Sequence, residues 1–92
     1  GKWHNRAPLF ARSFQNGANI LMGGGSDPYR VPLHDYRSDG VYPAQADRIG
    51  DKHASELFTD AAVRFLEDHD RAKPFFLYLA YTAPHDPRIS PP

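Results

Sequence analysis

The chain of 92 residues contains no cysteine and no excess charge of either sign. Without cysteine it has no disulfide framework, no thiolate zinc site and no cysteine nucleophile. Eleven Lys and Arg balance eleven Asp and Glu, whereas nucleic-acid binders normally carry a basic surface and a high pI. The longest apolar run, residues 75–83, is far shorter than the roughly 20 residues that span a membrane. We therefore expect no membrane span and no nucleic-acid partner.

The composition indicates one small, ordered, loop-rich unit. Hydrophobic residues make up 40% and aromatic residues 13% of the chain, which is too rich for a disordered segment. Nine prolines and seven glycines, however, predict a large share of loop. The chain starts without methionine and without an apolar leader, so we expect a piece of a longer protein.

The chain divides into three parts. Residues 1–13 are basic and aromatic, and residues 14–53 are loop-like, with short strands expected at 19–22 and 30–33. Residues 54–92 hold the regular structure. Their first half predicts an amphipathic helix, with Ser55 as the expected N-cap. Its apolar stripe recurs at helical spacing and consists of Ala54, Leu57, Phe58, Ala61, Ala62, Phe65 and Leu66.

Residues 75–81 form a continuous apolar and aromatic run between prolines. Such a run predicts a strand that is buried on both faces, as in parallel sheets covered by helices. A helix, a short turn and a buried strand make half of a βαβ unit, so the predicted fold class is α/β. The loop that follows carries His85, at the sheet edge where α/β proteins bind ligands. A lone strand needs neighbours on its edges, which again indicates a fragment.

Three residues are candidates for chemistry. Lys2 and His4 are two positions apart, so in an extended segment both side chains point to one side and can converge on an anion. The alternative for this pair is a solvated chain end. His85 lies between Pro84 and Pro87, which stiffen its backbone. The alternative for His85 is a turn histidine that caps a strand.

The other motifs favour structural interpretations. His34 and His53 lie beside loop aspartates and are expected at the solvated surface, while His69 suits the negative end of the predicted helix. The glycines at 23–25 fit neither phosphate-loop pattern, so we expect a flexible loop there. The five histidines are too scattered for a zinc motif, and no metal ligand is assigned within the chain.

Two segments together resemble a known family. The sequence Gly-Lys-Trp-His-Asn at 1–5 resembles the second signature of the type I, formylglycine-dependent sulfatases, or arylsulfatases. Residues 75–88 resemble the later strand of that family and its Ala-Pro-His loop. The resemblance covers essentially the whole chain. It implies a central fragment of an alkaline-phosphatase-like α/β/α sandwich with a mostly parallel sheet, so that residues 1–92 would be part of a sulfatase catalytic domain.

The resemblance also implies roles for the three candidates. Lys2 matches the lysine that contacts the sulfate and the formylglycine, and His4 matches the histidine cast as the base that expels sulfate. His85 matches the histidine on the leaving-group side, so Lys2 and His85 would bind substrate. The motif that supplies formylglycine and the ligands of the family's Ca²⁺ are absent from these residues. We therefore expect the nucleophile and the calcium ligands outside the fragment, and the fragment alone to be inactive.

The implied activity is the hydrolysis of sulfate monoesters of carbohydrates or aryl alcohols, in a periplasmic or secreted enzyme. Within the fragment, residues 1–13 would be an active-site segment, residues 14–53 a loop-rich insertion, and residues 54–92 a helix, a buried strand and an active-site loop. Two alternatives stay open. One is a phosphonate monoester or phosphodiester hydrolase of the same superfamily, and the other is a non-catalytic, sulfatase-like segment. The sequence indicates nothing about oligomeric state.

Overall fold

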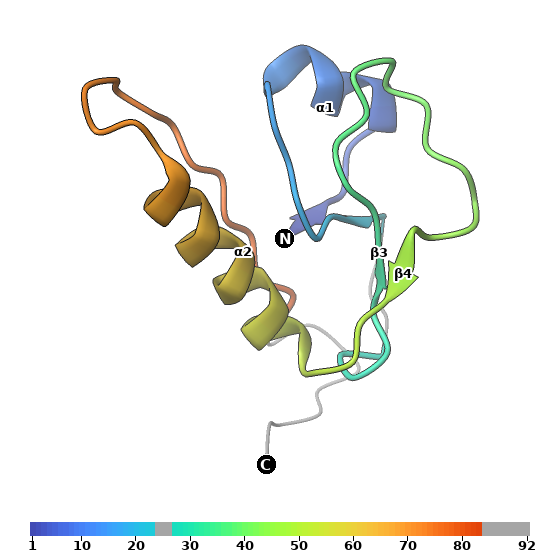
Figure 1. Cartoon of the computed structure of the whole chain (residues 1–92). Coiled ribbons are helices and arrows are strands. Elements are labelled where there is room, and N and C mark those ends of the chain that lie inside the picture. Colours follow the sequence, from blue (N-terminus) through green and yellow to red (C-terminus); the bar gives the residue numbers. More distant parts are fainter. Residues whose placement is uncertain (24–26, 84–92) are drawn as a thin grey trace.

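A computed structural model describes residues 1–23 and 27–83 (Figure 1). The described residues form a mix of two helices and short strands, which confirms the α/β class. In chain order, the elements are β1 Lys2–Trp3, α1 Ala7–Ser13, β2 Leu21–Met22, β3 Pro32–Leu33, β4 Arg48–Ile49 and α2 Ala54–Asp68.

The strands lie in the order β1, β2, β3, β4. Strands β1 and β2 are parallel, with Lys2 opposite Leu21 and Trp3 opposite Met22, whereas β3 and β4 are antiparallel. A bridge between Ile20 and His34 joins the two pairs. Among the described residues, therefore, only β1 and β2 form a parallel pair. A mostly parallel sheet stays a prediction for the whole domain.

The two helices cover opposite faces of these strands. Ile20 and Leu21 are consecutive in an extended segment, so their side chains point to opposite faces. Ile20 packs in a cluster with Trp3 and with Phe10 of α1. Leu21 packs in a second cluster that contains Phe58 of α2. The result is a helix–strand–helix layering, in which the α1 face and the α2 face have separate apolar cores.

Residues 75–81 run back along α2 in extended form, but they are not a strand (Figure 1). One backbone hydrogen bond, from the Lys2 N–H to the Ala80 carbonyl, 2.8 Å, joins them to β1. Phe76 is 79% exposed and Tyr78 50% exposed. The prediction of a strand buried on both faces is therefore wrong for the described residues. A strand needs a ladder of such bonds along at least one edge, and this segment has one bond.

The side chains of the same segment nevertheless alternate between the two helices. Phe76 stacks on Phe14 just after α1, with ring centroids 6.3 Å apart. Phe75 contacts Phe65 of α2 edge-on at 5.5 Å, and the Tyr81 and Thr59 hydroxyls are 2.6 Å apart. The segment thus has the two apolar faces that the sequence predicted, one toward each helix.

Helix α2 confirms the apolar stripe in outline and corrects its start. Four stripe residues are buried, namely Ala54, Leu57, Phe58 and Ala62. The predicted cap, Ser55, is wrong because His53 occupies the N-cap and its Nδ1 accepts the Ser55 N–H at 3.1 Å. At this N-cap, an imidazole nitrogen accepts the backbone N–H that a serine or aspartate oxygen usually accepts.

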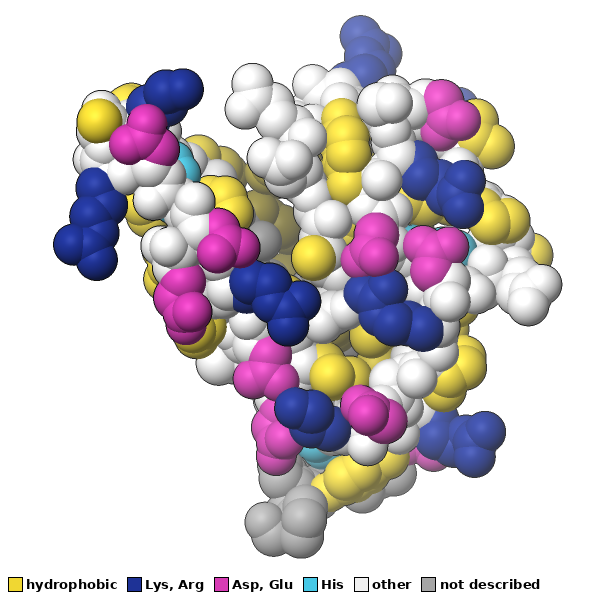
Figure 2. All heavy atoms as spheres, viewed as in Figure 1, with side chains coloured by type: hydrophobic (Ala, Val, Ile, Leu, Met, Phe, Trp, Pro, Cys, Tyr) yellow, Lys and Arg dark blue, Asp and Glu magenta, His cyan; other side chains and the backbone are white. Residues whose placement is uncertain are grey.

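The loop between β3 and β4, residues 34–47, is held by ion pairs. Arg48 forms a two-pronged pair with Asp35, with both N–O distances at 2.8 Å, and this guanidinium lowers the pKa of the Asp35 carboxyl. The Asp47 carboxylate accepts the Asp35 N–H at 2.9 Å, and that bond lowers the pKa of Asp47. Figure 2 shows acidic and basic side chains interleaved on the face with α2 and β4, where Lys52 pairs with Asp60.

Candidate functional site

Lys2 belongs to strand β1, and His4 follows the end of this strand in the chain. Lys2 lies opposite Leu21 in the parallel ladder, and paired residues share a face, so its side chain lies on the α2 face. His4 follows the strand two positions later and is exposed, whereas Lys2 is partly buried. The convergence of Lys2 and His4 on one anion stays a prediction, because β1 ends at Trp3 and His4 lies beyond it.

Neither the Lys2 nor the His4 side chain has a counterion or a hydrogen-bond partner in the described part of the chain. Within residues 1–23 and 27–83, no hydrogen bond or ion pair engages the Lys2 ammonium or the His4 imidazole. By contrast, Lys52 on the surface holds Asp60 at 2.8 Å. A lysine ammonium without a counterion within the protein is free to pair with an anionic ligand.

Strands β1 and β2 are parallel, so their carboxyl ends lie at the same edge. This is the edge where α/β proteins place their ligands. His4 follows β1 at this edge, and Gly23 follows β2 with a φ of +96°. Among the described residues, apart from the chain neighbours of Gly23, no atom lies within 4 Å of the position that a Cβ of Gly23 would occupy. His85, the third candidate, lies outside the described residues.

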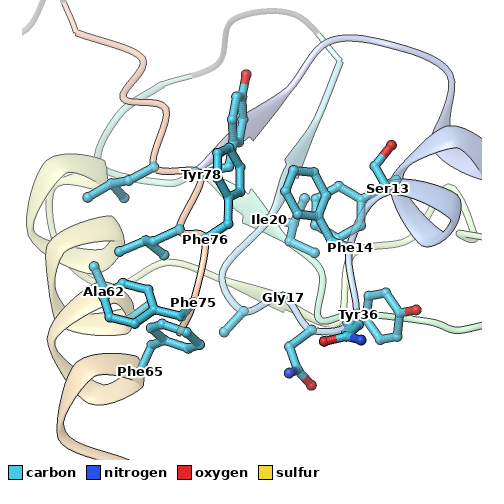
Figure 3. Close-up of a pocket in the computed structure, with 18 of the residues that line it drawn as sticks. Ser13, Phe14, Gly17, Ile20, Tyr36, Ala62, Phe65, Phe75, Phe76 and Tyr78 are labelled. Carbon is cyan, nitrogen blue, oxygen red and sulfur yellow. The ribbon is translucent and has the colours of Figure 1, made fainter. Parts of the chain in front are cut away.

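A cavity of about 1030 Å³ lies away from this edge (Figure 3). It is bordered by the segment that leads into β2, including Gly17, and by aromatic side chains such as Phe14, Phe65 and Phe76. Lys2 borders the cavity and His4 does not. The cavity therefore lies toward the amino ends of β1 and β2, and it is distinct from the edge that carries His4.

The remaining histidines are structural, and two of them differ from expectation. His34 and His53 were predicted at the solvated surface, but they are only 6% and 5% exposed. His53 caps α2, and His34 packs edge-on against Tyr42 at 5.5 Å. His69 is the C-cap of α2 and stacks on Phe65, which confirms its structural role. No local pattern signals the burial of His34 and His53, because it depends on residues distant in the chain.

The described residues do not assemble a metal centre. No group of three or more His, Asp or Glu side chains among residues 1–23 and 27–83 could hold a metal ion. In the same part of the chain, no helix is long and apolar enough to cross a membrane.

Trp3, between the candidates Lys2 and His4 in the chain, is buried. Its indole lies on the face opposite to Lys2, in the α1 core. Its ring nitrogen donates to the Arg6 carbonyl at 3.1 Å. The i, i+2 alternation could have placed Trp3 on the far side of the strand, but the sequence offered no sign of this hydrogen bond.

Two curated relatives match the chain over nearly its whole length. An uncharacterized sulfatase from Schizosaccharomyces pombe is 28% identical over 109 aligned residues, which cover 99% of this chain and 19% of that protein. An arylsulfatase from Klebsiella aerogenes is 30% identical over 100 aligned residues, which cover 99% of this chain and 22% of that protein. No family model and no solved structure matches the chain.

These relatives confirm the resemblance that the motifs at 1–5 and 75–88 predicted. Over nearly its full length, the chain is similar in sequence to a segment of each of these two sulfatases. It spans about a fifth of the length of the curated relatives it matches, 19% and 22%.

Proposed function

We propose that the protein to which this segment belongs is a sulfuric ester hydrolase that cleaves sulfate monoesters of carbohydrates or aryl alcohols. The segment contributes Lys2, His4 and His85 to the site. The observation that carries the proposal is the pair at the end of β1. Lys2 lies in β1 and His4 directly follows this strand, and neither side chain has a hydrogen-bond or ion-pair partner among the described residues. Similarity to two sulfatases supports the reaction class.

The proposed roles follow from the charge that moves in the reaction. Water and the ester R–O–SO₃⁻ give R–OH and HSO₄⁻, so the ester oxygen gains electrons and must gain a proton. Lys2 is a fixed cation that stabilises the sulfuryl oxygens as their charge shifts. His85 protonates the departing oxygen, and His4 is the base that assists the later expulsion of sulfate. Each such proton transfer contributes typically ~10²–10⁴-fold to the rate.

The nucleophile and the metal belong to other parts of the protein in this proposal. A formylglycine residue outside the chain supplies a nucleophilic hydroxyl, and Ca²⁺ on oxygen ligands outside the chain polarises the sulfate. The described residues offer no ligand set for that ion, so no step through it is assigned to them. The proposed domain is an alkaline-phosphatase-like α/β/α sandwich of a periplasmic or secreted enzyme. Within it, residues 1–13 are an active-site segment, 14–53 a loop-rich insertion and 54–92 the second active-site part.

The test of reaction class is a comparison of three esters with the full-length protein. We expect hydrolysis of 4-nitrophenyl sulfate to exceed that of a 4-nitrophenyl phosphonate monoester and of bis(4-nitrophenyl) phosphate. Sulfate and phosphate esters have similar shapes and differ in charge, so the ratio of kcat/KM values shows which class of ester the site prefers. Faster cleavage of either phosphorus ester would transfer the assignment to that hydrolase class. No cleavage of any ester by protein that carries formylglycine and calcium would favour a non-catalytic segment.

The role of His85 has its own test, which depends on the leaving group. A general acid matters most when the departing alcohol is a poor leaving group. His85→Ala should therefore cost more with an alkyl or sugar sulfate than with 4-nitrophenyl sulfate. Equal losses with both substrates would exclude the general-acid role and leave His85 as a sulfate-binding residue.

A further inference from the structure

Trp3 links the β1 strand to α1 in two ways. Its ring is 8% exposed and lies edge-on to Phe10, Phe14 and Tyr78, at centroid distances of 5.3, 5.9 and 6.0 Å. Its indole N–H donates to the Arg6 carbonyl at 3.1 Å. The ring packing is what any large apolar side chain provides, whereas the hydrogen bond needs an indole.

The hydrogen bond closes the turn that carries His4. It joins the side chain of residue 3 to the backbone of residue 6, so His4 and Asn5 lie in a loop that is closed at both ends. The Arg6 carbonyl also accepts the Leu9 N–H at 3.1 Å, which fixes it at the start of α1. One acceptor thus ties the end of β1 to the first turn of the helix.

His4 depends on this turn for its position. The imidazole is exposed and has no hydrogen-bond partner among the described residues. Its place is therefore set by its own backbone. That backbone is fixed on the strand side, because the Trp3 carbonyl accepts the Gly23 N–H at 2.9 Å. Beyond His4, the next fixed point is the indole bond to Arg6.

We propose that Trp3 is a positioning residue for His4, and that its indole N–H braces the turn that aims the imidazole at the substrate. The catalytic consequence rests on the proposed function, since His4 must act in sulfate ester cleavage for its position to affect the rate. The effect of Trp3 on the position of His4 does not rest on the proposed function, because the mobility of the imidazole can be measured without any substrate.

The test is the replacement of Trp3 by 3-benzothienylalanine in the full-length protein. This analogue keeps the size and shape of the indole and replaces the N–H by sulfur, so the packing against Phe10 and Phe14 is preserved and the donor is lost. We expect kcat for 4-nitrophenyl sulfate to fall roughly 10- to 100-fold, since small misplacements of an acting group cost that much. KM should change much less. The Cε1–H resonance of His4, assigned by its loss in His4→Ala, should sharpen as the ring gains freedom.

The matched control removes a bond of the same kind elsewhere on α1. The Ser13 hydroxyl donates to the Leu9 carbonyl at 2.8 Å, so Ser13→Ala deletes a side-chain-to-backbone hydrogen bond in the same helix. This variant should leave kcat and the His4 resonance unchanged. A second variant, Phe14→Leu, loosens the packing around Trp3 and keeps the N–H. It should lower the thermal midpoint without the loss in kcat.

Each outcome decides the proposal. A sharper His4 resonance together with a lower kcat supports it. An unchanged His4 resonance in the benzothienylalanine protein overturns it, whatever the rate does, because the imidazole then needs no brace. If the wild-type protein cleaves no sulfate ester, the proposed function fails by itself, and the resonance still decides whether Trp3 positions His4.

Discussion

The burial of Phe58 in the α2 face leads to a prediction about the stability of the layer that supports Lys2. Phe58 is 0% exposed and packs with Leu21, Val31 and Leu33 from two neighbouring strands. Phe58→Ala removes a ring from a site with no solvent contact, and substitutions of this type cost roughly 3–5 kcal/mol. Since each 1.4 kcal/mol is a factor of ten, the opening equilibrium of α2 should rise roughly 100- to 4,000-fold.

The assay is amide hydrogen exchange of the full-length protein, read by mass spectrometry on the peptide that covers α2. The matched control is Val63→Ala on the same helix, because Val63 is 45% exposed and surface substitutions usually stay within about 0.5 kcal/mol. Protection of α2 should collapse in Phe58→Ala and persist in Val63→Ala. Similar exchange in the two variants would refute the assignment of the Phe58 face to the core.

Three further predictions concern the loops and charges around the strands. The depressed pKa of Asp35 contributes stability that is present above its unfolded value and is lost as the pH falls through its folded value. Arg48→Leu should therefore lower the free energy of unfolding at pH 7 by the ~0.2–1 kcal/mol typical of exposed pairs. This loss should shrink as the pH falls below the unfolded-state pKa of Asp35. Gly40→Ala should destabilise the protein by about 1–2 kcal/mol, because Gly40 has a φ of +71° and L side chains are strained there; an unchanged denaturation midpoint would contradict this. Lys52→Ala should leave the thermal midpoint nearly unchanged, because both partners in the Lys52–Asp60 pair are about half exposed; a clear fall in the midpoint would count against it.

The helix at 54–68 was predictable because its information is local. The apolar residues recur at helical spacing, and Phe58 and Ala62 of that stripe are buried in the structure. The cap was not predictable in the same way. His53 caps through Nδ1, and histidine is not among the residues preferred at this position.

Helix α1 was missed because its stability is tertiary. It has seven residues, of which only Phe10 is buried, and it has no side-chain cap and no acidic residue in its first turn. Isolated helices of this length are marginal in water. Contacts of Phe10 with Trp3 and with Tyr36, which is distant in the chain, supply the stabilisation, and a local pattern cannot contain them.

For residues 75–81, the sequence pattern predicted the two apolar faces correctly but not the burial or the strand pairing. Its composition predicted two apolar faces, and the alternation of Phe75 and Phe76 between the two helices agrees with that. Burial and strand pairing depend on neighbours, however, and β1 supplies one hydrogen bond to the segment. The same limit applies to the site. Motif positions indicated Lys2 and His4. Only the structure showed that the Trp3 indole closes the turn that leads from β1 to α1.

The most direct test of the central claim compares residues of the same type inside and outside the proposed site. Sulfate ester hydrolysis should be measured with the full-length protein and four variants, Lys2→Ala, His4→Ala, Lys52→Ala and His69→Ala. We expect kcat/KM to fall at least ~100-fold in the first two, as for loss of a charge-stabilising or proton-transferring group, and to stay within a few-fold of wild type in the last two. Equal losses in all four, or no loss in Lys2→Ala and His4→Ala, would contradict the assignment of the site to the end of β1.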